Sequence, residues 1–130
     1  MSSRIDAVLA SARAGLTRLS ADDVPAALDR GALLVDIRPA AQRAREGDVP
    51  AALVIERNVL EWRCDPAGPW RHPAITGRDQ HLILICQQGF QSSLAAAALQ
   101  RLGLVNVTDL DGGFAAWAAA ALPVTQAGNR

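Results

Sequence analysis

The chain has 130 residues, the size of one ordinary domain, so we expect residues 1–130 to fold as a single domain. Half of the residues are hydrophobic and a fifth are charged, which excludes a disordered or low-complexity chain. The 13 basic residues, all of them Arg, balance 13 acidic residues, and this neutral charge disfavours nucleic acid and anionic membranes as partners.

The first quarter of the chain predicts two helices. Apolar residues at helical spacing over 5–12 indicate an amphipathic helix within 1–15, which Ser2 or Ser3 caps and Gly15 ends. We expect this helix to pack onto the domain as an added element. Residues 16–19 can form a short strand, and a capping pattern that begins at Ser20 predicts a second helix that ends at Gly31.

The middle of the chain predicts two buried strands and a long irregular segment. Residues 32–37 form an apolar run that only Asp36 interrupts, which is typical of a strand covered on both faces. A short helix over 39–45 precedes a second strand at 52–55. Residues 62–79 are rich in Pro and Gly, so we expect them to be irregular and to cover one end of the sheet.

The last third begins with the apolar strand HLILI at 81–85, which runs directly into Cys86. The elements that follow are a loop over 87–91, an Ala-rich helix over 92–102, a short strand over 107–110, a turn at Gly112 and Gly113, a helix through Trp117, and a frayed tail over 125–130. Strands that alternate with helices predict an open parallel sheet with helices on both faces.

The sequence has only two cysteines, Cys64 and Cys86, with no CxxC pair and no Cys/His cluster at ligand spacing. This pattern disfavours a metal site and a disulfide framework. Residues 1–14 carry charges and do not resemble a signal peptide, and no apolar run is long enough to span a bilayer. We therefore expect a cytoplasmic protein, in which a lone cysteine stays reduced.

Cys86 is the candidate nucleophile because it lies at the carboxyl end of a predicted parallel strand, where such sheets place their reactive crevice. Gly89 lets the following loop turn its amides inward, and Ser92 and Ser93 can cap the next helix. Amides at a helix N-terminus bind an anion and favour a thiolate, so no histidine is needed. The alternative is a small buried structural cysteine, which is the commoner fate of a free Cys.

Four stretches give the chain a resemblance to the single-domain rhodanese family of sulfurtransferases. They are LLVDIR at 33–38, EGDVPAALVI at 46–55, CQQGFQSS from Cys86, and LDGGFAAW at 110–117. Their order and spacing are specific, and the resemblance covers residues 16–124. It implies a rhodanese-like α/β fold, with an open parallel five-stranded sheet flanked by helices on both faces. It also implies a catalytic cysteine that carries a persulfide sulfur from a donor to an acceptor.

The resemblance assigns roles residue by residue. Cys86 takes the nucleophile position, and Asp36 and Arg38 take a strand-end pair that is more structural than catalytic. The substrate cradle consists of Gln87, Gln88, Gly89, Phe90, Gln91 and Ser92, while Gly112, Gly113 and Trp117 match turn and packing positions. The reaction needs no metal or organic cofactor.

The loop departs from the family pattern in charge. Many members have Arg directly after the cysteine and at the end of the loop, where this chain has Gln87 and Gln91. The change leaves the donor open, because two charges that would hold thiosulfate are missing. Arg57, Arg63 or Arg71 could supply a replacement charge, and Arg63, beside Trp62, is our candidate. A second departure, Asp48 for His and Ala51 for Gly, lies away from the site.

The expected function is transfer of a sulfane sulfur from thiosulfate or a persulfide to a thiol, cyanide or protein acceptor. The alternative is a non-catalytic rhodanese-like binding or regulatory module, although the intact Cys, Gly and Ser pattern argues against it. A phosphatase is disfavoured, because it needs an Arg six positions after the cysteine and position 92 is Ser.

Several other residues allow two interpretations. Cys64 could resolve a persulfide at Cys86, and Trp62 and Trp70 could wall the site, although packing against the sheet is the more common role. Phe90 could be a substrate lip or a plug, and we favour the lip. His72 and His81 show no partner pattern, so we expect surface or packing roles for them.

Overall fold

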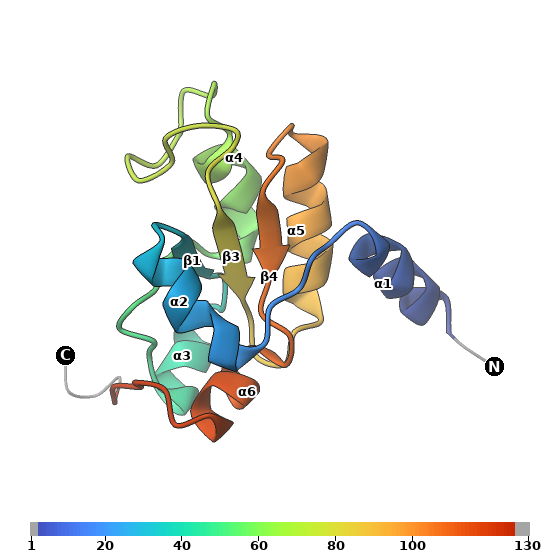
Figure 1. Cartoon of the computed structure of the whole chain (residues 1–130). Helices are drawn as coiled ribbons and strands as arrows, with labels where there is room; N and C mark the ends of the chain where they lie inside the picture. The colour runs from blue at the N-terminus through green and yellow to red at the C-terminus, as the bar shows by residue number, and fades with distance from the viewer. Residues whose placement is uncertain (1–2, 127–130) are drawn as a thin grey trace.

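Four parallel strands form the sheet at the centre of the molecule, in the order β2-β1-β3-β4 (Figure 1). The computed structural model describes residues 3–126. The strands are β1 (Leu33–Asp36), β2 (Leu53–Val54), β3 (Leu82–Ile85) and β4 (Val107–Asp109). β3 is buried along its whole length, as its continuous apolar run predicts.

The sheet has four strands rather than the predicted five, because residues 16–19 do not form a strand. Only Leu19 pairs, through a single parallel bridge to Leu110 beyond the end of β4. The carbonyl of Thr17 accepts a hydrogen bond from the side-chain hydroxyl of Thr108 (2.8 Å) instead of continuing a backbone ladder. The segment therefore lies beside β4 and leads directly from the first helix into the body of the molecule.

Helices cover both faces of the sheet, as predicted. They are α1 (Arg4–Ala14), α2 (Val24–Asp29), α3 (Ala40–Glu46), α4 (Leu60–Cys64), α5 (Gln91–Arg101) and α6 (Gly113–Ala119), with short 3-10 turns η1 (Ala21–Asp23) and η2 (Arg57–Val59). α4 was not predicted, because the Pro- and Gly-rich sequence pointed to an irregular segment from residue 62. Burial of Leu60 and Cys64 stabilises this short helix, and the rest of that segment is irregular.

Two apolar clusters form the core, one on each face of the sheet. On one face, Val35 and Leu84 pack in a cluster with Leu60 of α4 and Leu99 of α5. On the other face, the neighbouring strand residues Leu34, Ile83 and Ile85 pack in a cluster with Val24 and Trp117. This alternation follows from the two-residue period of a strand, and it holds α5, which begins at the Cys86 loop, against the sheet.

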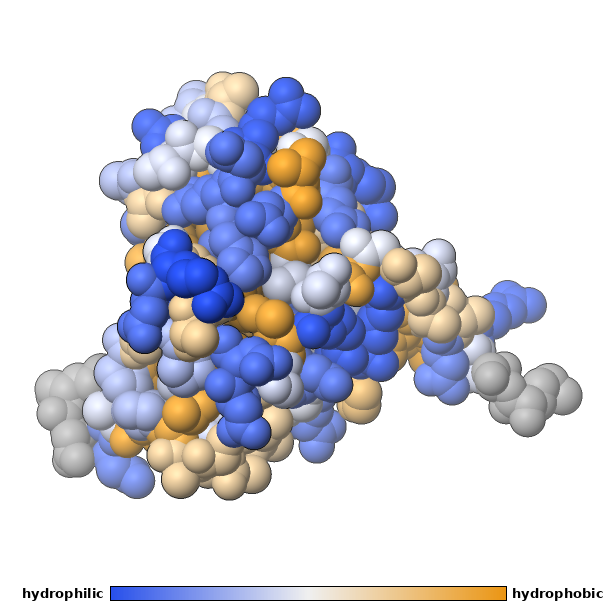
Figure 2. All heavy atoms as spheres, in the orientation of Figure 1, coloured by the Kyte–Doolittle hydropathy of each residue, from blue (hydrophilic) through white to orange (hydrophobic). Residues whose placement is uncertain are grey.

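α1 lies at the right edge of the molecule in Figure 1, where it contacts α5, and it projects in the same way in Figure 2. Ser3 caps the helix by accepting a hydrogen bond from the Asp6 amide (3.2 Å), while Ser2 lies outside the described residues. No residue of α1 is buried, and a groove of about 780 Å³ lies between α1 and α5. α1 is therefore an added element, as expected, that contributes little to the core.

Backbone pairing near the C-terminus extends to residue 125, which the sequence placed in a frayed tail. Thr125 forms an antiparallel bridge with Asp48, with N–H to carbonyl distances of 2.8 and 2.9 Å. Residue 125 is therefore not part of a frayed tail, and residues 127–130 of that predicted tail lie outside the described residues. Between residues 3 and 126, no helix has the length and apolar character required to cross a membrane.

Candidate active site

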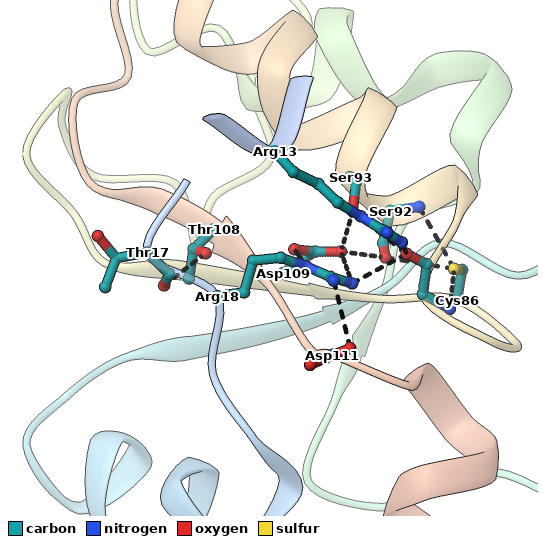
Figure 3. Close-up of polar contacts among 10 residues, drawn as sticks. Arg13, Thr17, Arg18, Cys86, Ser92, Ser93, Thr108, Asp109 and Asp111 are labelled. Atoms are coloured by element: carbon teal, nitrogen blue, oxygen red, sulfur yellow. Dashed lines mark hydrogen bonds and ion pairs between the residues drawn. The ribbon is translucent and has the colours of Figure 1, made fainter. Parts of the chain in front are cut away.

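Cys86 lies directly after β3, at the carboxyl edge of the sheet, and its side chain is almost completely buried. Its Sγ accepts hydrogen bonds from the backbone amides of Gly89 (3.2 Å) and Ser92 (3.3 Å). Ser92 Oγ lies 3.3 Å from the same sulfur (Figure 3). The loop and the first turn of α5 therefore surround the sulfur with hydrogen-bond donors, an arrangement that stabilises a thiolate.

Further amides of the loop have no partner. The N–H groups of Gln87, Gln88, Phe90 and Gln91 make no hydrogen bond to any residue between 3 and 126. Unpartnered amides before a helix are the groups that hold anions in other sites at helix N-termini. The predicted cradle therefore has both amides that contact Sγ and amides that are free for a substrate.

The start of α6 supports the loop from behind. The carbonyl oxygens of Cys86 and Gln87 accept hydrogen bonds from the amides of Phe114 (2.7 Å) and Ala115 (3.0 Å). The approach is so close that a Cβ added at Gly113 would lie 2.5 Å from the Cys86 carbonyl oxygen. Gly113, with φ of +59°, is therefore required both by its backbone conformation and by the lack of space.

A buried carboxylate at the end of β4 organises the side of the loop opposite α6. Asp109 Oδ2 accepts hydrogen bonds from the hydroxyls of Ser92 (2.7 Å) and Ser93 (2.8 Å), and its Oδ1 accepts one from Arg18 Nε (2.9 Å). The two serines therefore do not cap α5, whose N-cap is Phe90 without a side-chain bond. The expectation that they act as caps was wrong, because Asp109 competes successfully for both hydroxyls.

A pocket of about 360 Å³ opens over Cys86 and brings most of the predicted cradle together. Its lining residues are Ile37, Arg38, Pro39, Gln42, Arg57, Cys86, Gln87, Gln88, Phe90 and Gln91. Phe90 is 57 % exposed, with the Arg13 guanidinium 5.8 Å from its ring centre. Phe90 therefore forms a lip of the pocket rather than a plug.

Arg57 of η2, and not Arg63 of α4, is the arginine that lines this pocket. Arg57 Nη1 pairs with Glu61 (2.7 Å), and its buried Nε has no hydrogen-bond partner within the described chain. Arg63 instead donates to the Trp70 carbonyl (2.9 Å) and lines other cavities. The prediction that Arg63 supplies the replacement charge at the Cys86 loop was therefore wrong, because α4 directs this side chain away from Cys86.

Asp36 and Arg38 form a buried ion pair at the end of β1. Arg38 Nη2 lies 2.7 Å from Asp36 Oδ2, and the guanidinium also contacts Glu46 and stacks on Phe114 at 4.2 Å. Burial lowers the pKa of Arg38, but Asp36 and Glu46 outweigh this effect and raise it. With its guanidinium engaged by these groups, Arg38 fixes the wall of the pocket, in keeping with a structural pair.

The remaining candidates lie away from the pocket. Cys64 is buried in the core. Burial and the charge of Glu61 raise the pKa of its thiol to about 12, although Arg63 acts in the opposite direction. Trp62 and Trp70 are mostly exposed and line cavities other than the Cys86 pocket, so neither the sheet-packing nor the site-wall interpretation holds.

The two histidines and Arg71 also lie outside the pocket. Burial, aided by Arg30, lowers the pKa of His81. Arg71 donates to the Ile75 carbonyl, and His72 Nδ1 accepts from the Ala74 amide.

Sequence reasoning missed three polar residues behind the loop, Arg13, Arg18 and Asp109, and it also missed the hydrogen bond from Ser93 to Asp109. Asp109 carried a usable signal, because it is an acid that ends a short strand, as Asp36 does. Arg13 and Arg18 carried none, since their role depends on the path by which residues 15–19 pass the edge of the sheet.

The chain thus combines an open parallel α/β sheet with a cysteine at a strand end, whose sulfur accepts hydrogen bonds from two loop amides. Residues 20–120 match the model of the rhodanese-like domain, and the chain belongs to that family. The predicted resemblance is thus confirmed.

Several relatives are named as sulfurtransferases, and two of them cover most of this chain. A sulfurtransferase of Allochromatium vinosum is 35 % identical over 92 residues, which cover 71 % of this chain and 77 % of the relative. The thiosulfate sulfurtransferase GlpE of Pseudomonas savastanoi pv. phaseolicola is 28 % identical, covering 78 % and 87 % of the two chains.

A solved structure from Rhodopseudomonas palustris CGA009 superimposes with a TM-score of 0.83, at 31 % identity, and covers 95 % of this chain and 96 % of its own. That protein is of unknown function and is described as a possible tyrosine phosphatase.

Proposed function

We propose that this chain is a sulfurtransferase in which Cys86 carries the transferred sulfur as a persulfide. In the first step the Cys86 thiolate attacks the outer sulfur of a donor such as thiosulfate. A new S–S bond forms at Cys86, the bond within the donor breaks, and the leaving group, sulfite in this case, departs with the electron pair. In the second step a thiolate or cyanide attacks the outer sulfur of the persulfide and releases the Cys86 thiolate.

The observation that carries this proposal is the ring of amides around Cys86 Sγ. Two amides contact the sulfur at 3.2 and 3.3 Å, and four more are free. The first pair stabilises a thiolate nucleophile, and the free amides can hold either the anionic donor or the negative charge of the persulfide. No proton has to move through a histidine for either step, because both the nucleophile and the leaving group are anions.

Arg57 supports the binding of an anionic donor. Arg57 and Arg38 are the two arginines that line the pocket. Asp36 and Glu46 both engage the guanidinium of Arg38, whereas Arg57 pairs with Glu61 alone and its Nε has no partner in the described chain. A guanidinium at the rim compensates in part for the neutral Gln87 and Gln91 of the loop. Binding of a dianion such as thiosulfate therefore rests on Arg57 and on the loop amides together.

A phosphatase activity, suggested for the relative from Rhodopseudomonas palustris, has less support. The loop from Cys86 to Ser92 contains no arginine to stabilise a transferring phosphoryl group. The nearby Arg13 and Arg18 both bond the carbonyl of Gly89 instead of lining the pocket. A non-catalytic module has less support too, because the cradle around the thiol is complete.

A turnover panel tests the proposal. Purified protein is assayed with thiosulfate, mercaptopyruvate and a low-molecular-weight persulfide as donors, and with cyanide and thiols as acceptors. We expect turnover with at least one donor, its loss in Cys86→Ala, and its retention in Cys64→Ala. The absence of turnover with every pair, or hydrolysis of an aryl phosphate that depends on Cys86, would contradict the proposal.

The need for a reduced Cys86 also favours the cytoplasm as the site of action.

A further inference from the structure

We propose that α1 is part of the active site and that Arg13 is a positioning residue that holds the Cys86 loop in its anion-binding conformation. The expected effect of Arg13 on catalysis rests on the proposed function, whereas its restraint on the loop conformation does not. Arg13 lies outside residues 20–120, which match the rhodanese-like domain, so the family match assigns it no role.

Two arginines converge on one carbonyl of the loop. The Gly89 oxygen accepts hydrogen bonds from Arg13 Nη2 (2.8 Å) and Arg18 Nη2 (3.0 Å), and Ser93 Oγ, whose proton goes to Asp109, lies 3.2 Å from it. Arg13 Nε donates in addition to Ser93 Oγ (3.0 Å), so that its guanidinium bonds two neighbouring groups at once. Figure 3 places Arg13 and Arg18 together beside Ser92, Ser93 and Asp109. Two guanidiniums on one neutral carbonyl oxygen make a strong, charge-assisted restraint.

The restraint acts on the peptide that joins Gly89 to Phe90. Because a trans peptide is planar, its carbonyl and its N–H point in opposite directions. Gly89 has φ of +86°, and a glycine has more freedom than any other residue to rotate this peptide. With the carbonyl held by the two arginines, the Phe90 amide faces away from them. Rotation would remove one free amide from the cradle and bring a partly negative oxygen toward the bound anion.

Arg13 can be replaced without disturbing the core. No residue of α1 is fully buried, and α1 contacts the rest of the molecule mainly through α5. A second tie between α1 and α5, from Gln100 Nε2 to the Gly15 carbonyl (2.9 Å), does not involve Arg13. Arg18, in contrast, is also paired with the buried Asp109, so its replacement would alter more than the loop. Arg13 is therefore the residue with which the idea is tested.

The experiment compares Arg13→Ala and Arg13→Lys with Arg4→Ala, a control from the first turn of the same helix whose side chain contacts no loop residue. Three properties are measured: kcat/KM for the sulfur donor, thermal stability, and amide hydrogen exchange of the segment 86–93. We expect Arg13→Ala to lower kcat/KM about tenfold, in line with the loss of a charge-assisted hydrogen bond, and to speed exchange in that segment alone. Lys retains one charged donor, so Arg13→Lys should recover about half of the loss on a logarithmic scale.

The exchange measurement keeps this inference separate from the proposed function. If no donor supports turnover in the wild type, the proposed function fails, and faster exchange of 86–93 in Arg13→Ala still supports the positioning role. If Arg13→Ala matches Arg4→Ala in exchange and in kcat/KM, the positioning role is overturned. Failure of Arg13→Lys to recover either property would likewise contradict a role that depends on a charged donor.

Discussion

Ser92 joins the sulfur of Cys86 to a buried carboxylate, because its hydroxyl lies 3.3 Å from Sγ and donates to Asp109 at 2.7 Å. While it donates to Asp109, its lone pairs are free to accept the S–H of the resting thiol. If it turns from Asp109, it can donate to the thiolate instead. The serine hydroxyl can thus either accept from the sulfur or donate to it, and its bond to Asp109 competes with donation to the sulfur.

Replacement of Ser92 tests this link. We expect Ser92→Ala to lower kcat/KM for the donor about tenfold, because the neutral or charged sulfur loses a hydrogen-bond partner. Ser93→Ala is the matched control, since Ser93 donates to the same Asp109 oxygen (2.8 Å) but makes no contact with Sγ. Thermal unfolding should give similar losses of stability for both variants, while activity should fall further in Ser92→Ala. Equal activities would contradict a role of the hydroxyl at the sulfur.

The ion pair of Arg18 with Asp109 should make a large contribution to stability. Asp109→Asn leaves Arg18 without its buried partner, and we expect the free energy of unfolding to fall by about 2–4 kcal/mol. Asp111→Asn is the control, because Asp111 pairs with the same guanidinium at 3.2 Å but is 67 % exposed, and its loss should cost less than about 1 kcal/mol. Denaturant titration measures both values. A larger loss of unfolding free energy for Asp111→Asn than for Asp109→Asn would contradict the role of Asp109 as the main partner of Arg18.

Cys64 should make the protein less stable at high pH. Its thiol has a pKa of about 12 in the folded chain against 9.0 ordinarily, so between these values the unfolded chain releases a proton that the folded chain retains. The unfolded state then binds fewer protons, and stability falls as pH rises, by about 1.4 kcal/mol per pH unit, whereas below pH 9 this group has no effect.

The measurement for Cys64 is the free energy of unfolding of the wild type and of Cys64→Ala at pH 8, 9, 10 and 11. The sequence contains no Lys and no Tyr, so few other side chains titrate in this range. The difference between the two proteins should change progressively above pH 9 in favour of the variant. Parallel curves throughout would mean that the folded chain does not hold this thiol neutral.

Arg57 should control the affinity for an anionic donor. We expect Arg57→Gln to raise KM for thiosulfate about tenfold, because the pocket loses its rim charge, and expect the effect to shrink as salt rises. Arg63→Gln is the control, since Arg63 lies elsewhere and binds the Trp70 carbonyl. Steady-state kinetics at two salt concentrations measure both variants. A rise in KM for Arg63→Gln alone would contradict the position that we assign to the donor.

The parts of the fold that follow from local sequence could be predicted. The run HLILI has no polar position, which fits a central parallel strand, and its end places Cys86 at the edge where such sheets bind ligands. Gly89 and the following helix start indicate a turn of amides around that edge. The nucleophile and its cradle are therefore properties of one continuous segment, which a single sequence can reveal.

The parts that depend on distant segments could not be predicted. Residues 16–19 have the composition of a strand, but the Thr17 carbonyl accepts the Thr108 hydroxyl and only Leu19 pairs with the sheet. Ser92 and Ser93 have the pattern of helix caps, yet Asp109, 16 or more residues away, binds both hydroxyls. Arg57 and Arg63 look equivalent in the sequence, and only the fold, which places Arg57 in η2 and Arg63 in the last turn of α4, decides which one lines the pocket.

Peptide mass spectrometry after a single exposure to a sulfur donor tests the central claim most directly. The protein is incubated with excess donor without an acceptor, the remaining thiols are alkylated under native conditions, and the digested peptides that hold Cys64 and Cys86 are compared. We expect one added sulfur atom on Cys86, its removal by cyanide or a thiol, and an unmodified Cys64, whose thiol is buried and protonated. An unmodified Cys86 beside a modified Cys64, or no added sulfur from any donor, would contradict the account.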